Sequence, residues 1–228
     1  MMLKKNKGFT LAELLIALAV CASLAAIIMP AIAYIRPDKK KVMFKKAYYV
    51  AERMVYELAN DEDFYPTTGE TVGLANTIQT TYLGHTYGAA SNESKQKGKF
   101  CSLFARKVNT NEDLTYNNGV LDVCKDASRS VPSGNGTYTT PTFVTTDGIS
   151  WYLPYTDFKS TNYNDTDGAK IYVDVNGDEG PNCINSHVTG CKPDIFIIHV
   201  MADGKMYVKG DKEKEYLSTS KLSKDRGK

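Results

Sequence analysis

The chain has 228 residues, of which 42% are hydrophobic and 24% are charged. This length allows one or two domains. The 28 basic and 26 acidic residues leave a formal net charge of +2 at pH 7, so nucleic acid is not expected as a partner. The sequence also contains no G-x-x-x-x-G-K-[ST], H-E-x-x-H or G-x-S-x-G motif, and we therefore do not expect an enzyme.

A long apolar run follows a short basic leader at the start of the chain. The leader carries Lys4, Lys5 and Lys7, and from Phe9 to Ile35 the only charged residue is Glu13. At about 1.5 Å per residue, the segment from Leu14 to Ile35 would form roughly 33 Å of helix, which matches the hydrocarbon thickness of a bilayer. The run predicts a membrane-spanning helix.

A cleaved secretory signal peptide is the first alternative, but its apolar core has only about 7 to 15 residues, and this run is longer. A simple uncleaved anchor is the second. Such an anchor would gain nothing from Glu13, because a charge at the centre of a membrane helix costs about 2.5 to 3.5 kcal/mol, and less towards the interface. We therefore expect Glu13 to have a function and a partner.

A resemblance to a known family rests on the stretch Gly8-Phe9-Thr10-Leu11-Ala12-Glu13-Leu14-Leu15, together with the lysines before it and the apolar run after it. This segment resembles the N-terminus of type IV pilins and of the pseudopilins of type II secretion. In that family a prepilin peptidase cuts after the glycine and methylates the new N-terminus. The resemblance implies a leader of residues 1–8, cleavage between Gly8 and Phe9, and a transmembrane and assembly helix over residues 9–35.

The resemblance also implies a function as a structural subunit. The N-terminus would lie in the cytoplasm because of its basic leader, the chain would cross the cytoplasmic membrane once, and the rest would be exported. An assembly ATPase and a platform membrane protein would then move the subunit into a filament with other pilin subunits, outside the cell or in the periplasm. Phe9, Glu13 and Pro30 would serve assembly, Pro30 by bending or loosening the helix.

A binding function is the alternative. A minor pilin or tip adhesin would use its head to contact a surface, DNA or a secreted substrate. The large head, with a long insert between helix and sheet, favours this alternative slightly.

A second helical pattern follows the apolar run. From Lys39 to Asn60, apolar residues recur at the spacing of one helix face, namely at Met43, Ala47, Val50, Met54 and Leu58. We expect residues 36–60 to be the amphipathic second half of one long helix. Pro66 and the residues before it end the helix.

The remaining chain predicts a globular head over residues 61–208. A short helix is expected at 99–108 and a turn at 117–119. Two strands on either side of Asp147-Gly148 predict a hairpin with a two-residue turn, and three further strands are expected at 170–175, 194–200 and 205–208. The fold class is therefore α+β: an antiparallel sheet of about four strands packed on the amphipathic helix, as in pilin heads. Residues 209–228 are charged and nearly without core-forming residues, so a mobile tail is expected.

The five cysteines divide by position. Cys21 lies in the apolar run, where it is expected to be a packing residue. The other four lie in the exported part, where two disulfides are expected with three possible connectivities. We favour Cys101 with Cys124 and Cys183 with Cys191, because short loops close most easily. The alternative of a zinc site is not supported, since the spacing contains no C-x-x-C.

One loop carries oxygen ligands at alternate positions after a strand, as calcium loops do: Asp174, Asn176 and Asp178. Some pseudopilins carry calcium in a loop between head strands, and the resemblance supports Ca²⁺ as a cofactor here. The loop departs from the EF-hand pattern, since Glu179 stands where a glycine is expected. A polar turn is the alternative interpretation.

Overall fold

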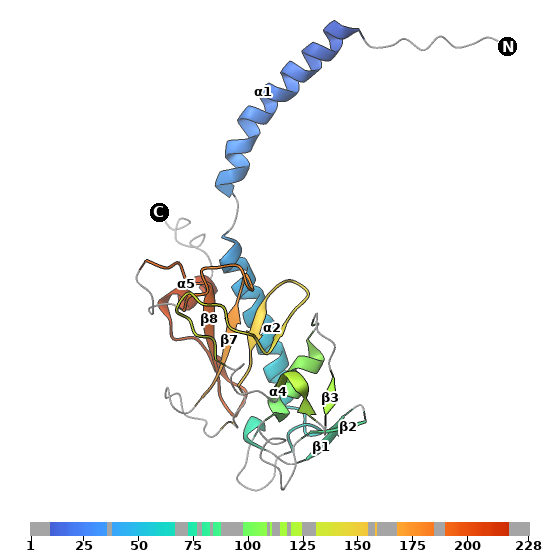
Figure 1. Cartoon of the computed structure of the whole chain (residues 1–228), viewed down its shortest axis with the longest axis vertical. Coiled ribbons are helices and arrows are strands. Elements are labelled where there is room, and N and C mark those ends of the chain that lie inside the picture. The colour runs from blue at the N-terminus through green and yellow to red at the C-terminus, as the bar shows by residue number, and fades with distance from the viewer. Residues whose placement is uncertain are drawn as a thin grey trace, which may run out of the picture. The chain divides into compact units, whose positions relative to one another are not determined.

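The computed structural model divides the chain into two compact units, one ending at Asp38 and the other beginning at Lys39 (Figure 1). The structure describes residues 10–35, 38–66, 73–76, 79–82, 84–87, 98–108, 110, 115–117, 120–124, 131–154, 158, 168–184 and 190–218.

The described part of the first unit is essentially one helix, α1 (Leu11–Ile35). By length and composition α1 can cross a membrane, and it is the one such helix in the described part of the chain. None of the residues from Leu11 to Met29 is buried. A helix that is apolar on all sides is covered by lipid or by other protein in its working state, because each exposed Leu or Ile gains about 1.5 to 3 kcal/mol on burial.

The second unit begins with helix α2 (Lys39–Ala59). The structure thus divides the predicted long helix into two helices, and Asp38 belongs to neither. In the sequence, Pro37 stands between the two helices, and proline lacks an N–H and disfavours helical dihedral angles in the residue before it. Residues 36 and 37 themselves lie outside the described residues.

One face of α2 is buried, as its periodicity predicts. The buried residues are Phe44, Ala47, Ala51, Met54, Val55 and Leu58. Met43 and Val50, which we placed on this face, are only partly buried and lie at its border. The centre of the face is therefore rotated slightly towards Phe44 and Ala51.

The head contains an antiparallel sheet with the strand order β5-β6-β7-β8-β9, which has five strands where about four were predicted. The strands are β5 (Phe143–Val144), β6 (Ser150–Tyr152), β7 (Ala169–Asp174), β8 (Ile195–Val200) and β9 (Met206–Tyr207). In the central pair, Ile171 lies opposite Ile198 and Val173 opposite Phe196. The predicted α+β class is confirmed.

The hairpin between β5 and β6 differs from the prediction in its turn. The Gly148 N–H donates to the Thr145 carbonyl (2.8 Å), and the Thr145 N–H donates to the Ile149 carbonyl (3.0 Å). The loop therefore has three residues, with Gly148 at φ +83°, a conformation that glycine adopts without steric cost. This is the turn with a glycine bulge rather than the two-residue turn.

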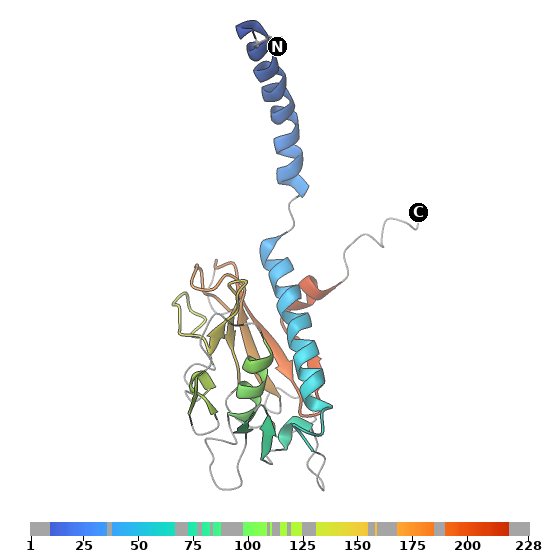
Figure 2. The same cartoon turned by 90° about the vertical axis from the view of Figure 1, so that its right-hand side faces the viewer.

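The sheet packs on α2, which runs along the outside of the head (Figure 2). The rings of Phe44 on α2 and Phe196 on β8 lie 4.6 Å apart between centroids. The buried core continues through Trp151, whose ring stacks near Phe143 at 6.2 Å. Burial of these aromatic side chains fixes the helix against the sheet.

Short elements fill the segment between α2 and β5. They are η1 (Gly73–Ala75), β1 (Thr80–Tyr82), β2 (His85–Tyr87), α4 (Lys99–Lys107), β3 (Tyr116–Asn117), β4 (Val120–Leu121) and η2 (Asp122–Cys124). Helix α4 confirms the helix predicted at 99–108, and it lies beside α2. β3 pairs with β4 as a small hairpin; residues 118 and 119 of the predicted turn lie outside the described residues.

The segment after β9 corrects one expectation. We expected residues 209–228 to form a mobile charged tail, but helix α5 (Asp211–Leu217) packs on the head. Tyr216 is only 4% exposed, and its ring lies 5.5 Å from that of Phe196 and 6.4 Å from that of Phe44. Leu217 packs against the same core as Tyr216, and the Glu213 carboxylate accepts a hydrogen bond from the Ile197 N–H on β8 (3.4 Å). Residues 219–228 lie outside the described residues.

Candidate functional site

The processing residues predicted from the sequence, Gly8 and Phe9, lie outside the described residues. The other two residues assigned to assembly, Glu13 and Pro30, lie in α1, one in its first turn and one near its end.

Thr10 and Glu13 cap the start of α1. The Glu13 carboxylate accepts hydrogen bonds from the Thr10 backbone N–H (2.8 Å) and from the Thr10 hydroxyl (2.9 Å). In return, the Glu13 N–H donates to the Thr10 hydroxyl oxygen (3.3 Å). These reciprocal bonds form a capping box, which satisfies N–H groups that a helix start leaves without partners.

The capping box supplies the partner that a carboxylate in an apolar helix requires. Hydrogen bonds to a charged oxygen are among the stronger ones, and the positive end of the helix dipole favours an acid in the first turn. The role of Thr10 was missed in the sequence, although the pattern [ST]-x-x-[DE] before an apolar run predicts a capping box. The signal was present at Thr10 and Glu13.

The four cysteines of the head form two disulfides with the favoured connectivity. Cys101 in α4 is bonded to Cys124 in η2, with 5.7 Å between their Cα atoms. Cys183 is bonded to Cys191, with 6.5 Å between their Cα atoms. The first bond ties α4 to η2, which follows β4, and the second closes a loop before β8. Cys21 in α1 is free and exposed.

The predicted calcium residues do not share one cavity. Asn176 and Asp178 line a surface cavity together with Glu179, and Asp174 is not among its lining residues. Asp174 is completely buried, whereas Asp178 is exposed. The Asn176 amide nitrogen donates to the carbonyls of Glu179 and Gly180, so this side chain closes the turn. In this arrangement the Asn176 amide nitrogen is engaged within the turn, and Asp174 lies apart from the cavity that Asn176 and Asp178 line.

Asp174 instead belongs to a buried polar cluster with Asp194 and Asn182, two residues that the sequence did not indicate. Asp194 accepts hydrogen bonds from the backbone N–H groups of Asn182 (3.1 Å) and Cys183 (2.8 Å). With its amide nitrogen turned towards Asp174, Asn182 donates to the Asp174 carboxylate (3.1 Å). This cluster fastens the loop after β7 to the start of β8.

Burial raises the pKa of Asp174 from 3.8 to about 7. The neighbouring Asp194 carboxylate acts in the same direction, while backbone N–H groups of Asn176 and Gly177 and the charge of Lys40 act against it. A buried carboxyl group favours its neutral form because the charged form loses hydration.

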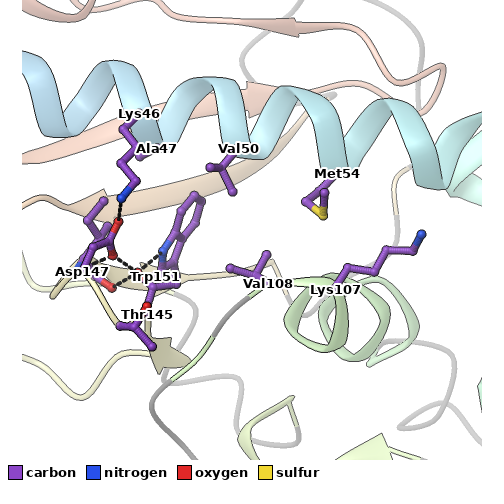
Figure 3. Close-up of a pocket in the computed structure, with 11 residues that line it drawn as sticks. Lys46, Ala47, Val50, Met54, Lys107, Val108, Thr145, Asp147 and Trp151 are labelled. Atoms are coloured by element: carbon purple, nitrogen blue, oxygen red, sulfur yellow. Dashed lines mark hydrogen bonds and ion pairs between the residues drawn. The ribbon is translucent and has the colours of Figure 1, made fainter.

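A cavity of about 250 Å³ lies between α2, the end of α4 and the β5–β6 hairpin (Figure 3). Its polar groups are already engaged with one another. Lys46 pairs with Asp147 at 2.8 Å, and the Trp151 ring N–H donates to the Thr145 hydroxyl at 3.2 Å. Met54 and Val50 provide an apolar wall. We assign this cavity a packing role, because its charges are paired within the head.

One comparison with known proteins identifies the segment at the start of the chain. A family model described as the prokaryotic N-terminal methylation motif matches residues 3–29. A search of curated proteins and a search of solved structures each found no match. The match confirms the resemblance, and the motif implies processing by prepilin peptidase and assembly with other pilin subunits. The chain thus carries the hallmark segment of prepilin-like structural proteins, the type IV pilins and pseudopilins.

Proposed function

We propose that this chain is a subunit of a type IV pilus or pseudopilus filament, cleaved after Gly8 and methylated on Phe9. The observation that carries the proposal is the pairing of the methylation motif with a helix whose apolar side chains are uncovered from Leu11 to Met29. Such a surface suits two successive environments, the lipid of the cytoplasmic membrane and the interior of a filament built from many copies. Enzyme activity is not part of this function.

The capping box explains how Glu13 serves both environments. In the membrane, Thr10 supplies two hydrogen bonds to the carboxylate. In a filament, the amino group of Phe9 in a neighbouring subunit would pair with the same carboxylate. A charge pair in a water-excluded core fixes the position of the partners more than it adds net stability. Glu13 would therefore set the axial register of the subunits.

The proposal also assigns partners and a location. Prepilin peptidase removes the leader on the cytoplasmic side, and an assembly ATPase with a platform membrane protein extracts the subunit. The N-terminus remains cytoplasmic until extraction, and the head lies on the exported side, where Cys101–Cys124 and Cys183–Cys191 form.

Mass spectrometry of the mature chain tests processing, and filament counts test assembly. We expect an N-methylated phenylalanine at position 9 as the first residue, and a Gly8→Leu chain that stays uncleaved. A Glu13→Ala chain should be inserted and cleaved but should form few filaments, and Glu13→Asp serves as the matched control. A mature chain that starts at Met1 or beyond Ala33 would overturn the proposal.

A minor subunit or tip adhesin is the second candidate. It is favoured by the amount of structure inserted between α2 and β5, where α4 and two small hairpins are added to the sheet and helix. The head of such a subunit would bind a surface, DNA or a secreted substrate. Abundance in sheared filaments separates the two candidates, because a major subunit dominates them and a minor one is scarce.

A further inference from the structure

The outer face of α2 carries a line of exposed apolar side chains. Val42, Tyr49 and Tyr56 are spaced by seven residues, two helical turns, so they share one face. Their exposed fractions are 48%, 57% and 67%. We call these three residues the α2 stripe. It lies opposite the buried face of the helix, and the sheet and α4 do not cover it.

The charges beside the stripe are separated along the helix. The first half of α2 carries Lys39, Lys40, Lys41, Lys45 and Lys46 and no acid, whereas the second half and the residues after it carry Glu52, Glu57, Asp61, Glu62 and Asp63 with Arg53 as the one base. The first turn of α2 has no acidic residue and its last turn no basic residue. Within the helix, this order is the reverse of what the helix dipole favours.

Some of these charges have no opposite charge within the head. Among the described residues, no carboxylate forms an ion pair with Lys39, Lys41 or Lys45, and no base pairs with Glu52. By contrast, Lys46 pairs with Asp147, and Glu57 pairs with Arg53 and Lys107. The charges nearest the stripe are therefore available to another molecule.

We propose that the α2 stripe is a contact surface for a second copy of this chain, shifted along the helix so that the lysine-rich start of one α2 lies beside the acidic end of the next. A shift of about 14 residues, or roughly 21 Å at 1.5 Å per residue, brings the two charge groups together. The stripe would then pack on the neighbouring copy, with its tyrosines as anchors, a residue type enriched at the energetic centres of interfaces.

A second copy fits this surface better than a lipid surface does. Anionic headgroups would attract the lysines, but they would repel Glu52 and the acidic residues that follow. One staggered copy presents its lysines to the acidic end of α2, and a further copy, shifted the other way, presents its acids to the lysine-rich start; complementary potentials of this kind select partner and register. In this parallel, shifted arrangement the lysine-rich start of each α2 contacts one neighbour and its acidic end contacts another. The contact is therefore head-to-tail, and it continues along a filament instead of closing into a dimer. The inference rests on the proposed polymerisation.

Paired charge reversals test the contact in cells that express the full chain with its own assembly machinery. One chain carries Lys41→Glu and Lys45→Glu, a second carries Glu52→Lys and Glu62→Lys, and a third carries all four substitutions. We expect each single set to lower filament number by at least about tenfold and the combined chain to recover most of it, since reversed charges on both sides attract again. Lys214→Glu, which reverses an exposed lysine on α5, is the matched control.

The stripe itself is tested by a chain with Tyr49→Ser and Tyr56→Ser, with Tyr138→Ser as the control outside α2. We expect filament loss only in the former, at equal amounts of membrane-inserted subunit. Unchanged filament number in both reversed-charge chains, or a loss that the combined chain does not relieve, would overturn the contact while the proposed function stands. Absence of filaments from the unchanged chain would overturn the proposed function and the contact together.

Discussion

Glu13 is the residue of α1 whose side chain is hardest to accommodate in the two proposed environments, because its carboxylate is charged. An acid in an apolar helix is costly unless hydrogen bonds compensate it. Thr10 supplies this compensation through its backbone and its hydroxyl group. The pair is local in sequence, so the inserted subunit needs no other protein to tolerate Glu13.

We predict that Thr10→Ala lowers the amount of inserted subunit. The substitution removes the hydroxyl that bonds the Glu13 carboxylate and backbone, and loss of a capping side chain costs about 0.5 to 2 kcal/mol. Immunoblots of the membrane fraction, at equal transcript level, measure the effect. Thr10→Ser keeps the hydroxyl and should behave like the unchanged chain, whereas equal amounts of all three chains would contradict the prediction.

We predict that Asp174 makes the head less stable as the pH rises. Its pKa is raised from 3.8 to about 7, so the folded head binds a proton that the unfolded chain releases. The stabilising contribution is complete below about pH 4 and is lost as the pH rises through 7. Its upper limit is a few kcal/mol, because a tenfold change in an ionisation constant corresponds to about 1.4 kcal/mol.

Melting temperatures of the unchanged chain and of Asp174→Asn measure this contribution. The two chains should melt alike near pH 4, and Asp174→Asn should melt higher at pH 8. Parallel pH profiles for both chains would contradict the raised pKa of Asp174.

Calcium binding at Asp174, Asn176 and Asp178 stays a prediction, and a chelator added to the same melting series tests it. A bound ion would stabilise the ionised form of Asp174, so its removal by the chelator would lower the melting temperature of the head.

At the scale of elements, the periodic spacing of apolar residues predicted the helices and strands that bury one regular face. The spacing from Ala47 to Leu58 indicated α2, and apolar residues around Ile171 and Ile198 indicated the central strands. The favoured disulfides followed from loop length. The finer details depended on tertiary contacts, since the choice between Phe44 and Met43 as the centre of the buried face is made by Phe196 on β8.

Other elements were predicted incompletely for identifiable physical reasons. The turn at Asp147-Gly148 has the composition of a two-residue hairpin turn, and only the hydrogen bonds of Thr145 show that Gly148 is a bulge residue. Helix α5 has one large buried aromatic residue, Tyr216, in a charged sequence. The cluster of Asp174 and Asp194 joins residues that are distant in sequence, so spacing does not reveal it.

We predict that Tyr216→Ala destabilises the head by about 3 kcal/mol, in the range measured for removal of a buried aromatic side chain. The lost contacts are those with Phe44 and Phe196. Urea denaturation of the full chain in detergent, followed by Trp151 fluorescence, measures the change. Tyr138→Ala, at a partly exposed position, should cost less than about 1 kcal/mol. A loss below 1 kcal/mol for Tyr216→Ala would show that α5 is not part of the cooperative core.

At the scale of the whole molecule, the chain combines two units with different demands on their surroundings. None of the residues of α1 from Leu11 to Met29 is buried, while the head from Lys39 onward has a buried core and two disulfides. The apolar run predicted α1, but α1 and α2 were expected to be the two halves of one long helix.

The contact of Tyr216 with Phe44 also affects when the apolar face of α2 is covered during synthesis of the chain. Phe44 lies in the first helix of the head and Tyr216 in its last, so the apolar face of α2 stays partly uncovered until nearly the whole chain has emerged. Contacts between residues far apart in sequence form late, and exposed apolar surface in that interval promotes aggregation. Among the described elements, α5 is therefore the last to be synthesised of those that cover the apolar face of α2.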